Sequence, residues 1–355
     1  MENKLLSCYK KVLVTGGLGF IGGSLISNLL ESTQANIFNI DKLGYASDSK
    51  RIDERISYLN LAQDRYTFIK ADLCNKYHIE EIISEINPDC IFHLAAESHV
   101  DKSICSPDNF IQSNVVGTFN LLESIRKNWL NMSESKKNIF RFLHVSTDEV
   151  FGSLGSSGLF SENSAYKPRS PYSASKAASD HIVDAYFHTF GLPILITNCS
   201  NNYGPWQYPE KFIPLIISKC LDSKDIPIYG DGQNIRDWIF VEDHIDALIL
   251  VMSEGKIGNH YCIGSSEEHT NVEIASIICN ILDDLIPLKA PHSSLISFVE
   301  DRLGHDRRYA IDSSKLKKEL GWYPKHTFHS GIKKTINWYH ENPHWVNRCF
   351  ELGLN

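Results

Sequence analysis

A glycine-rich turn near the start of the chain places the strictest limit on its fold. The stretch VLVTGGLGFIGGSLISNLL reads as a buried strand, a turn with Gly16, Gly19 and Gly22 in G-x-x-G-x-x-G spacing, and an apolar helix. Such glycines let the backbone approach a pyrophosphate, and the helix that follows directs free N–H groups toward it. The sequence therefore predicts a dinucleotide-binding unit; a tight turn without a ligand is the alternative.

Short β-branched runs alternate with amphipathic stretches through the first 200 residues, which predicts a parallel sheet covered by helices on both faces. After Cys199 the pattern is less regular and rich in Tyr, Pro, Trp and Asn. We therefore expect an α/β, Rossmann-type doubly wound sheet over residues 1–200, which carries the catalytic residues. Residues 201–355 should form a smaller substrate-binding lobe, with some segments returning to the first domain. The expected strands are KVLVTGG, NIFNID, YTFIKAD, CIFHLAA, RFLHVST and PILITNC.

Composition narrows the classes of partner. A net charge of −8 argues against binding to nucleic acid or to an anionic membrane, because both need a concentrated basic surface. No stretch approaches the ~20 apolar residues of a membrane span, and no secretory leader is evident, so we expect a cytoplasmic protein. The nine cysteines form no C-x-x-C pair and indicate free thiols. No His, Cys and Asp cluster has the spacing of metal ligands.

Two acidic residues follow expected strands on the cofactor side. Asp41 ends NIFNID, nineteen residues after Gly22, where a carboxylate can accept both ribose hydroxyls. It favours NAD because it would repel a 2′-phosphate, although the adjacent Lys42 leaves NADP open. Asp72 follows YTFIKA and is expected either to face the adenine or to cap the next helix.

A tyrosine and a lysine are predicted to share one helix face. The stretch SPYSASKAASDHIVDAY begins with Pro and continues with helical character, so Tyr172 and Lys176 lie one turn apart. A lysine ammonium near a phenol favours the phenolate and can lower the tyrosine pKa. Tyr172 could then take a proton from a substrate hydroxyl as hydride leaves.

At this point the chain resembles the extended short-chain dehydrogenase/reductase superfamily and, more closely, the dTDP-glucose 4,6-dehydratase family. The resemblance implies a Rossmann-type fold, tightly held NAD, a homodimer, and conversion of dTDP-glucose to dTDP-4-keto-6-deoxyglucose with loss of water. It runs through VTGGLGFIG, HLAAESHVDKSI, VSTDEVFG, PYSASKAASDH, NCSNNYGPWQYPEKFIPL, GDGQNIRDWIFVEDH and DRLGHDRRYAID.

The resemblance also implies a role for the two acids in VSTDEVFG. Tyr172 would take the C4 hydroxyl proton while hydride passes to NAD, and Thr147 would orient the C4 oxygen. Glu149 would then remove the C5 proton, and Asp148 would protonate the departing C6 hydroxyl. The two carboxyls must differ in protonation at one pH, which requires different environments; a solvated loop is the alternative. Phe151 stands where the family usually has Tyr, a change that we expect to be tolerated.

The residues and the resemblance together predict further contacts, with Arg favoured because it can bind phosphate through two parallel hydrogen bonds. Predicted cofactor contacts are Gly16, Gly19, Phe20, Ile21, Gly22, Asp41, Lys42, Asp72, Leu73, Leu94, Ala95, Ala96, Ser98, Tyr172 and Lys176. Predicted contacts with the nucleotide-diphosphate sugar are His99, Thr147, Asn201, Asn202, Glu210, Lys211, Arg236, Asn271, Asp301, Arg302 and His305. By resemblance, Arg236, Asn271 and Asp301 to His305 surround the diphosphate. Asn201, Asn202, Glu210 and Lys211 are expected in a Pro-rich loop followed by an apolar helix.

Three other nucleotide-sugar activities share the glycine turn and Y-x-x-x-K: a UDP-glucose 4,6-dehydratase, a 4-epimerase and a decarboxylase. The Asp148 and Glu149 pair argues against a 4-epimerase, because inversion at C4 needs neither a C5 base nor a C6 acid. A noncatalytic NAD-binding scaffold would be expected to lose Tyr172, Lys176 or an acid, and this chain keeps them all. Thymine and uracil nucleotides stay open.

Overall fold

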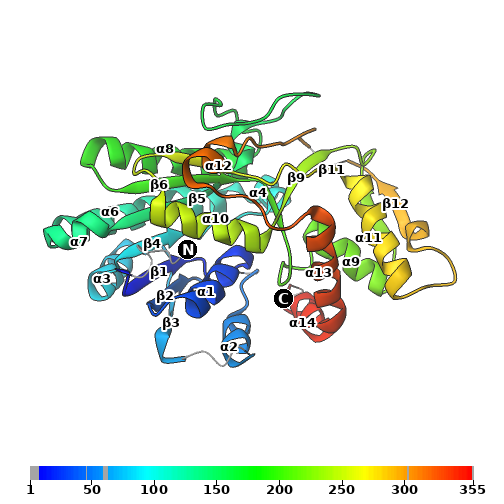
Figure 1. Cartoon of the computed structure of the whole chain (residues 1–355), viewed down its shortest axis with the longest axis horizontal. Helices are drawn as coiled ribbons and strands as arrows, with labels where there is room; N and C mark the ends of the chain where they lie inside the picture. The colour runs from blue at the N-terminus through cyan, green and yellow to red at the C-terminus, as the bar shows by residue number, and fades with distance from the viewer. Residues whose placement is uncertain (1–7, 45, 59–62, 302–303, 354–355) are drawn as a thin grey trace.

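The computed structural model describes residues 8–44, 46–58, 63–301 and 304–353. Its main sheet has seven strands in the order β10-β6-β5-β4-β1-β2-β3, with every neighbouring pair parallel (Figure 1). The prediction of a Rossmann-type doubly wound sheet is confirmed. The strands are β1 (Lys11–Thr15), β2 (Asn36–Asp41), β3 (Tyr66–Lys70), β4 (Cys90–His93), β5 (Arg141–Thr147), β6 (Ile194–Cys199) and β10 (His260–Ile263).

Helices cover both faces of this sheet because successive residues of a strand point to opposite sides. On β1, Val12 and Val14 belong to one apolar cluster, whereas Leu13 belongs to another on the opposite face. The first cluster includes residues of α1 (Phe20–Ser32), α2 (Ser49–Tyr58), α10 (Val241–Glu254) and α12 (Ser314–Leu320). The second includes residues of α3 (Lys76–Ile86), α6 (Gly117–Leu130) and α8 (Pro171–Phe190).

A separate apolar cluster forms a second, smaller core in the C-terminal half. Figure 1 shows its helices gathered beyond one end of the main sheet: α9 (Phe212–Leu221), α11 (Asn271–Leu285), α13 (Phe328–Glu341) and α14 (Pro343–Gly353). Two small sheets accompany them, with the orders β11-β9-β7 and β12-β8. Their strands are β7 (Asn201–Tyr203), β8 (Ile226–Tyr229), β9 (Ile235–Phe240), β11 (Glu268–Thr270) and β12 (Ile296–Val299). The remaining α-helices are the short α4 (Val100–Cys105), α5 (Pro107–Phe110) and α7 (Glu134–Ile139). A π-helical segment, Ile111–Val116, joins α5 to α6.

The chain passes between the two cores several times, since α10, β10 and α12 belong to the first core and α9, α11 and α13 to the second. It leaves the main sheet at Cys199 and enters the small sheet at Asn201, and it returns when β10 pairs with β6 at the sheet edge. The sequence placed Asn201 and Asn202 in a loop, which is wrong, because they pair with Trp238 and Ile239 of β9. No helix in the described ranges combines the length and apolar character needed to cross a bilayer.

Candidate active site

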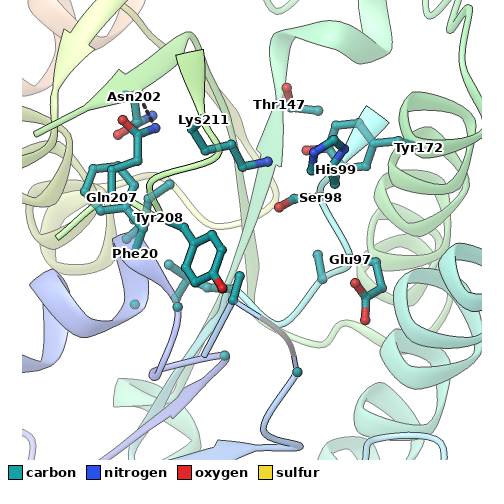
Figure 2. A pocket seen from close by; sticks show the side chains of 18 of the residues that line it. Phe20, Glu97, Ser98, His99, Thr147, Tyr172, Asn202, Gln207, Tyr208 and Lys211 are labelled. Carbon is teal, nitrogen blue, oxygen red and sulfur yellow. Dashed lines mark hydrogen bonds between the residues drawn. The ribbon is translucent and has the colours of Figure 1, made fainter. Parts of the chain in front are cut away.

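A cleft of about 780 Å³ lies where the parallel strands end, between the main sheet and the second core. This is the usual ligand site of an open α/β sheet. Figure 2 shows Asn202, Gln207, Tyr208 and Lys211 on one side of it and Glu97, Ser98, His99, Thr147 and Tyr172 on the other. All predicted site residues line the cleft except Asp148, Asp301 and Arg302, and Arg302 lies outside the described residues.

The glycine turn forms a cradle in which side chains do not fit. Gly16 has φ +71°, and a Cβ there would lie 2.7 Å from the backbone of Ala95. A Cβ on Gly22 would lie 2.3 Å from the carbonyl oxygen of Gly16. Gly19 precedes α1 without a side-chain cap, so the first-turn N–H groups of this helix face the cleft uncapped by a side chain. The turn therefore fits a diphosphate group held by backbone amides.

Asp41 is bound to the same turn. Its Oδ2 accepts the N–H of Leu18 at 3.1 Å, and its Oδ1 accepts the N–H of Leu43 at 2.8 Å and the hydroxyl of Ser47 at 3.0 Å. A carboxylate has about four acceptor sites, and these three donors leave about one for a ribose hydroxyl. Asp41 thus lies where the sequence predicted, but with less free acceptor capacity than contact with both ribose hydroxyls would need.

Lys42 is paired across the cofactor side of the cleft. Its Nζ lies 2.7 Å from Glu97 Oε1 and donates to Ser113 Oγ at 2.7 Å. Glu97 therefore balances the charge of Lys42, which leaves less positive charge to attract the 2′-phosphate of NADP.

Asp72 lines the cleft and does not cap the following helix. Asn75 is the residue that caps α3, since its side chain accepts the N–H of His78. Asp72 accepts the N–H of Cys74 at 2.9 Å. Of the two alternatives for Asp72, the cap is excluded by this arrangement.

The two adjacent acids lie in different surroundings. Strand β5 ends at Thr147, whose hydroxyl accepts the N–H of Glu149 at 3.3 Å and so starts the tight turn Asp148–Phe151. Glu149 is half-buried and lines the cleft, whereas the adjacent Asp148 is 2% exposed and is not among the lining residues. A solvated loop is therefore excluded.

Burial makes Asp148 a proton donor. Burial and the nearby Glu149 raise the pKa of Asp148 well above its usual value, against smaller opposing effects of Arg236 and Thr147. Its Oδ2 has no hydrogen-bond partner among the described residues. The raised pKa thus favours the protonated carboxyl, which is the state that an acid catalyst needs.

Tyr172 and Lys176 both line the cleft from α8, as the helical spacing predicted. Ser170 and Ser173 form a capping box that fixes the start of this helix. Burial and Glu149 raise the pKa of Tyr172 well above 10, although a hydrogen bond with Thr147 acts in the opposite direction. The predicted lowering of this pKa is therefore wrong for this structure. The Lys176 ammonium donates to the Val145 carbonyl at 2.9 Å, and burial dominates the environment of the phenol.

The predicted sugar contacts near the catalytic residues bridge the two sides of the cleft. Glu210 Oε1 lies 3.5 Å from His99 Nε2, and Glu210 Oε2 lies 3.9 Å from Lys102 Nζ. Burial and Lys211 lower the pKa of His99, so the ring is neutral at neutral pH. Lys211 extends into the pocket from the side of Asn202 toward the side that carries His99 and Thr147 (Figure 2).

The two asparagines of β7 differ in their contacts. Asn202 is held by His244 Nδ1 at 2.8 Å and by the Ser200 carbonyl at 3.0 Å, so its side chain supports the wall. Asn201 Oδ1 is buried without a hydrogen-bond partner among the described residues. Asn201 is accordingly the better candidate for a direct ligand contact.

Three of the predicted diphosphate contacts line the cleft: Arg236, Asn271 and His305. Arg236 donates to the Ile235 carbonyl at 2.8 Å and to the Asp306 carbonyl at 2.9 Å. His305 lies beside it in the lining together with Asn271, and Asp301 contacts His305 Nδ1 at 2.7 Å from outside the lining. Asp301 therefore positions His305 and does not face the cleft.

Phe151 occupies an apolar cluster behind the acids. It is 3% exposed, and its ring centroid lies 5.3 Å from those of both Phe160 and Tyr166. An aromatic ring without a hydroxyl fits this environment.

Several lining residues were missed from the sequence. Trp206 and Gln207 lie in a motif that carried the resemblance, so that motif was the available signal. Arg51 and Trp345 carry no motif, and only the packing of α2 and α14 brings them to the cleft. The main missed residues are Leu18, Arg51, Glu97, Cys199, Trp206, Gln207, Tyr208, Tyr229 and Trp345. Within the described chain, no group of three His, Cys, Asp or Glu residues is arranged to hold a metal.

Comparison with known proteins identifies the family. The family model described as GDP-mannose 4,6 dehydratase matches residues 13–335. A dTDP-glucose 4,6-dehydratase from Salmonella typhimurium is 50% identical over 346 residues, which cover 95% of this chain and 94% of that protein. The crystal structure of a dTDP-glucose 4,6-dehydratase from Bacillus anthracis in complex with NAD is 40% identical, with a TM-score of 0.83, and covers 96% of this chain and 99% of that one.

A second solved structure, a dTDP-glucose 4,6-dehydratase from Streptomyces venezuelae with NAD and another ligand bound, is 38% identical with a TM-score of 0.86. The match covers 96% of this chain and 99% of that one. The chain therefore belongs to the GDP-mannose 4,6 dehydratase family and is similar, within it, to the dTDP-glucose 4,6-dehydratases.

Proposed function

We propose that this chain is an NAD-dependent hydro-lyase that converts dTDP-glucose to dTDP-4-keto-6-deoxyglucose and water. The observation that carries the proposal is the pair of acids at the end of β5. Burial favours the protonated form of Asp148, while Glu149 lines the same cleft as Tyr172. Elimination of water needs an acid and a base on one substrate, and this pair provides them.

The cradle of Gly16, Gly19 and Gly22, with Asp41 beside it, fits NAD, and the other predicted cofactor contacts line the same cleft. When bound there, NAD would supply the hydride chemistry that the reaction needs at C4 and at C6 of the sugar. The following steps belong to residues of the chain.

Tyr172 receives the C4 hydroxyl proton, and the neighbouring Thr147 orients the C4 oxygen. The resulting 4-ketone acidifies C5–H, and Glu149 removes that proton. Asp148 donates its proton to the departing C6 hydroxyl, which leaves as water, and C5 would take up a proton again as hydride adds to C6. For Tyr172 to act as a base, its phenolate needs a nearby cation, and Lys176 is the cation that α8 supplies one turn away.

The ends of the cleft suggest how the nucleotide-diphosphate sugar is held. Arg236, Asn271 and His305 would receive the diphosphate at one end. His99, Asn201, Lys211 and Thr147 would contact the sugar near the acids. Asn202, Glu210 and Asp301 would support these contacts, since each is engaged by a neighbouring side chain.

We further infer that the protein is a cytoplasmic homodimer. Each subunit would have an NAD-binding lobe of residues 1–200 and a nucleotide-sugar lobe of residues 201–355. Within the second range, α10 and β10 return to the main sheet. Phe119, Leu130 and Phe190 on α6 and α8 are 41%, 53% and 43% exposed, and a second copy would cover them. Sedimentation of the purified protein as a monomer at micromolar concentration would contradict the dimer. The net charge of −8 supports neither nucleic-acid nor membrane binding.

A UDP-glucose 4,6-dehydratase is the second candidate, because the described residues near the diphosphate do not distinguish thymine from uracil. The purified protein should therefore be incubated separately with dTDP-glucose, UDP-glucose and GDP-mannose. We expect 4-keto product, read by its alkaline absorbance, from dTDP-glucose at the highest kcat/KM. Product with inverted C4 and no loss of water would contradict the proposal, as would stoichiometric release of reduced cofactor.

Gly16→Ala should weaken NAD binding by about tenfold or more, because a left-handed residue with a side chain costs about 1–3 kcal/mol even before its clash with Ala95. NAD that copurifies with the wild type and with the variant can be counted after denaturation. Gly155→Ala is the matched control, since a Cβ there meets no atom within 4 Å. Equal NAD content in wild type and Gly16→Ala would disprove the assignment of the cradle.

A further inference from the structure

Asp180 is a buried carboxylate on which donors from three parts of the fold converge. It is 1% exposed. Ser146 donates to its Oδ2 at 2.7 Å and Tyr166 at 2.9 Å, while Asn198 Nδ2 lies 3.4 Å away. His144 Nε2 lies 3.1 Å from its Oδ1. Such a set of donors favours the ionised carboxylate.

The balance of effects keeps Asp180 charged. Burial alone raises its pKa, but His144, the charge of Lys176 and the hydrogen bond from Ser146 together hold the pKa below its usual value. A charge with this little exposure needs an opposite charge close by. The structure contains two basic groups beside it, His144 and Lys176.

His144 cannot be that opposite charge. Burial, followed by Lys176, lowers its pKa to about 4, so the ring is neutral at neutral pH. The remaining cation is Lys176, whose Nζ lies 3.4 Å from the same His144 nitrogen. Lys176 is 4% exposed, and burial lowers its pKa while Asp180 is the largest effect that raises it. Asp180 and Lys176 therefore form one buried pair of charges with the neutral His144 between them.

We propose that Asp180 is a positioning residue that keeps the Lys176 ammonium charged and fixed beside the cofactor cleft and Tyr172. Tyr172, Lys176 and Asp180 follow one another at four-residue spacing, so α8 aligns base, cation and counter-charge on one face. The inference rests on the proposed function, because it explains how Lys176 stays available to the phenolate and to the cofactor. The titratable groups facing the pair are His144 on β5, Cys199 on β6 and Tyr166 before α8, with His93 and His260 behind His144.

Asp180→Asn is the test, because it keeps the shape and removes the charge. Without the carboxylate, Lys176 should lose its proton at a lower pH. NAD affinity and the rate of C4 oxidation should then fall by a factor that grows as pH rises, about tenfold for each unit of lysine pKa lost. Ser124→Ala is the control: it removes a buried hydrogen bond to the Asn120 carbonyl on α6, far from this pair in sequence. It should alter thermal stability only. A deficit of Asp180→Asn that is constant across pH would mean a merely structural role.

A double-mutant cycle with Lys176→Met tests whether Asp180 acts through the lysine. On the Lys176→Met background, Asp180→Asn should cause no further loss of NAD affinity or of C4 oxidation. Additive losses would overturn the proposal. If Asp180→Asn does not fold, Tyr166→Phe can replace it, because this change removes one hydrogen-bond donor to the carboxylate. Tyr166→Phe should give a smaller deficit that also grows as pH rises. An unchanged pH profile of Tyr166→Phe would count against the proposal.

The NAD-binding measurement separates this inference from the proposed function, because it uses no sugar. If dTDP-glucose is not dehydrated but the coupling between Asp180 and Lys176 appears in NAD affinity, the proposed function fails and the role of Asp180 stands. If dehydration proceeds but the coupling is absent in both readouts, only the role of Asp180 fails.

Discussion

Glu149→Gln is expected to oxidise C4 of dTDP-glucose and to stop there, with formation of the 4-keto-6-deoxy product reduced on the order of 10³-fold. The C4 proton leaves through Tyr172, which the substitution does not touch, but the amide cannot take the C5 proton. Glutamine keeps the size of a side chain that lines the cleft, so substrate binding should persist. Rapid mixing with dTDP-glucose should show reduced cofactor accumulating on the enzyme without product.

Tyr172→Phe is the matched comparison, since it should slow the first reduction itself. Exchange of solvent deuterium into C5 separates the two halves further: it should be lost in Glu149→Gln. Turnover near the wild-type rate, or normal deuterium exchange, would show that Glu149 is not the C5 base. The assignment of the acid pair to elimination would then be wrong.

Asp148→Asn should impair activity and stabilise the fold at the same time. Product formation should fall by about 10²- to 10⁴-fold, because the amide has no proton to give to the departing hydroxyl. The free energy of unfolding, in contrast, should increase at neutral pH. The pKa of buried Asp148 is raised above that of the unfolded chain, so stability is full below the unfolded pKa and is lost as pH rises toward the folded one. Asparagine is neutral throughout and escapes this loss.

Unfolding by denaturant across a range of pH measures the effect. Wild type and Asp148→Asn should be similar near pH 4, and the variant should gain about 1 kcal/mol or more by pH 7, since one pKa unit corresponds to about 1.4 kcal/mol. Asp53→Asn, at an exposed position on α2, serves as the control and should show no such trend. A variant that is less stable than the wild type at pH 7 would mean that Asp148 is ionised in the fold. Because Asp148 must carry a proton to act as the acid, product formation should decline at high pH.

The main sheet and the glycine turn could be predicted because their signals are local. Strands buried on both faces are continuous apolar runs, and the turn requires glycine at fixed positions. The positions of Arg51 and Trp345 could not be predicted, because each depends on how a distant helix packs. Asn201 and Asn202 were misplaced for the same reason: the partner strand, β9, lies elsewhere in the chain.

In the site, the identities of the catalytic residues could be predicted from the sequence, but their protonation states could not. Residue types and spacing were enough to select Asp148, Glu149, Tyr172 and Lys176. The protonation states were not available, because pKa values depend on burial and on neighbours brought together by folding. The pKa of Tyr172 shows this most clearly, since its direction is opposite to the one that the Lys176 spacing suggested.

The return of β10 to the main sheet affects how the protein is made. When residues 1–200 have left the ribosome, β6 still has an open edge, because its partner comes from residues 260–263. An uncovered apolar strand edge is a template for pairing with other chains. Nascent chains interrupted between these two points should therefore need chaperone protection, and an N-terminal fragment ending at residue 200 should aggregate where the full chain folds.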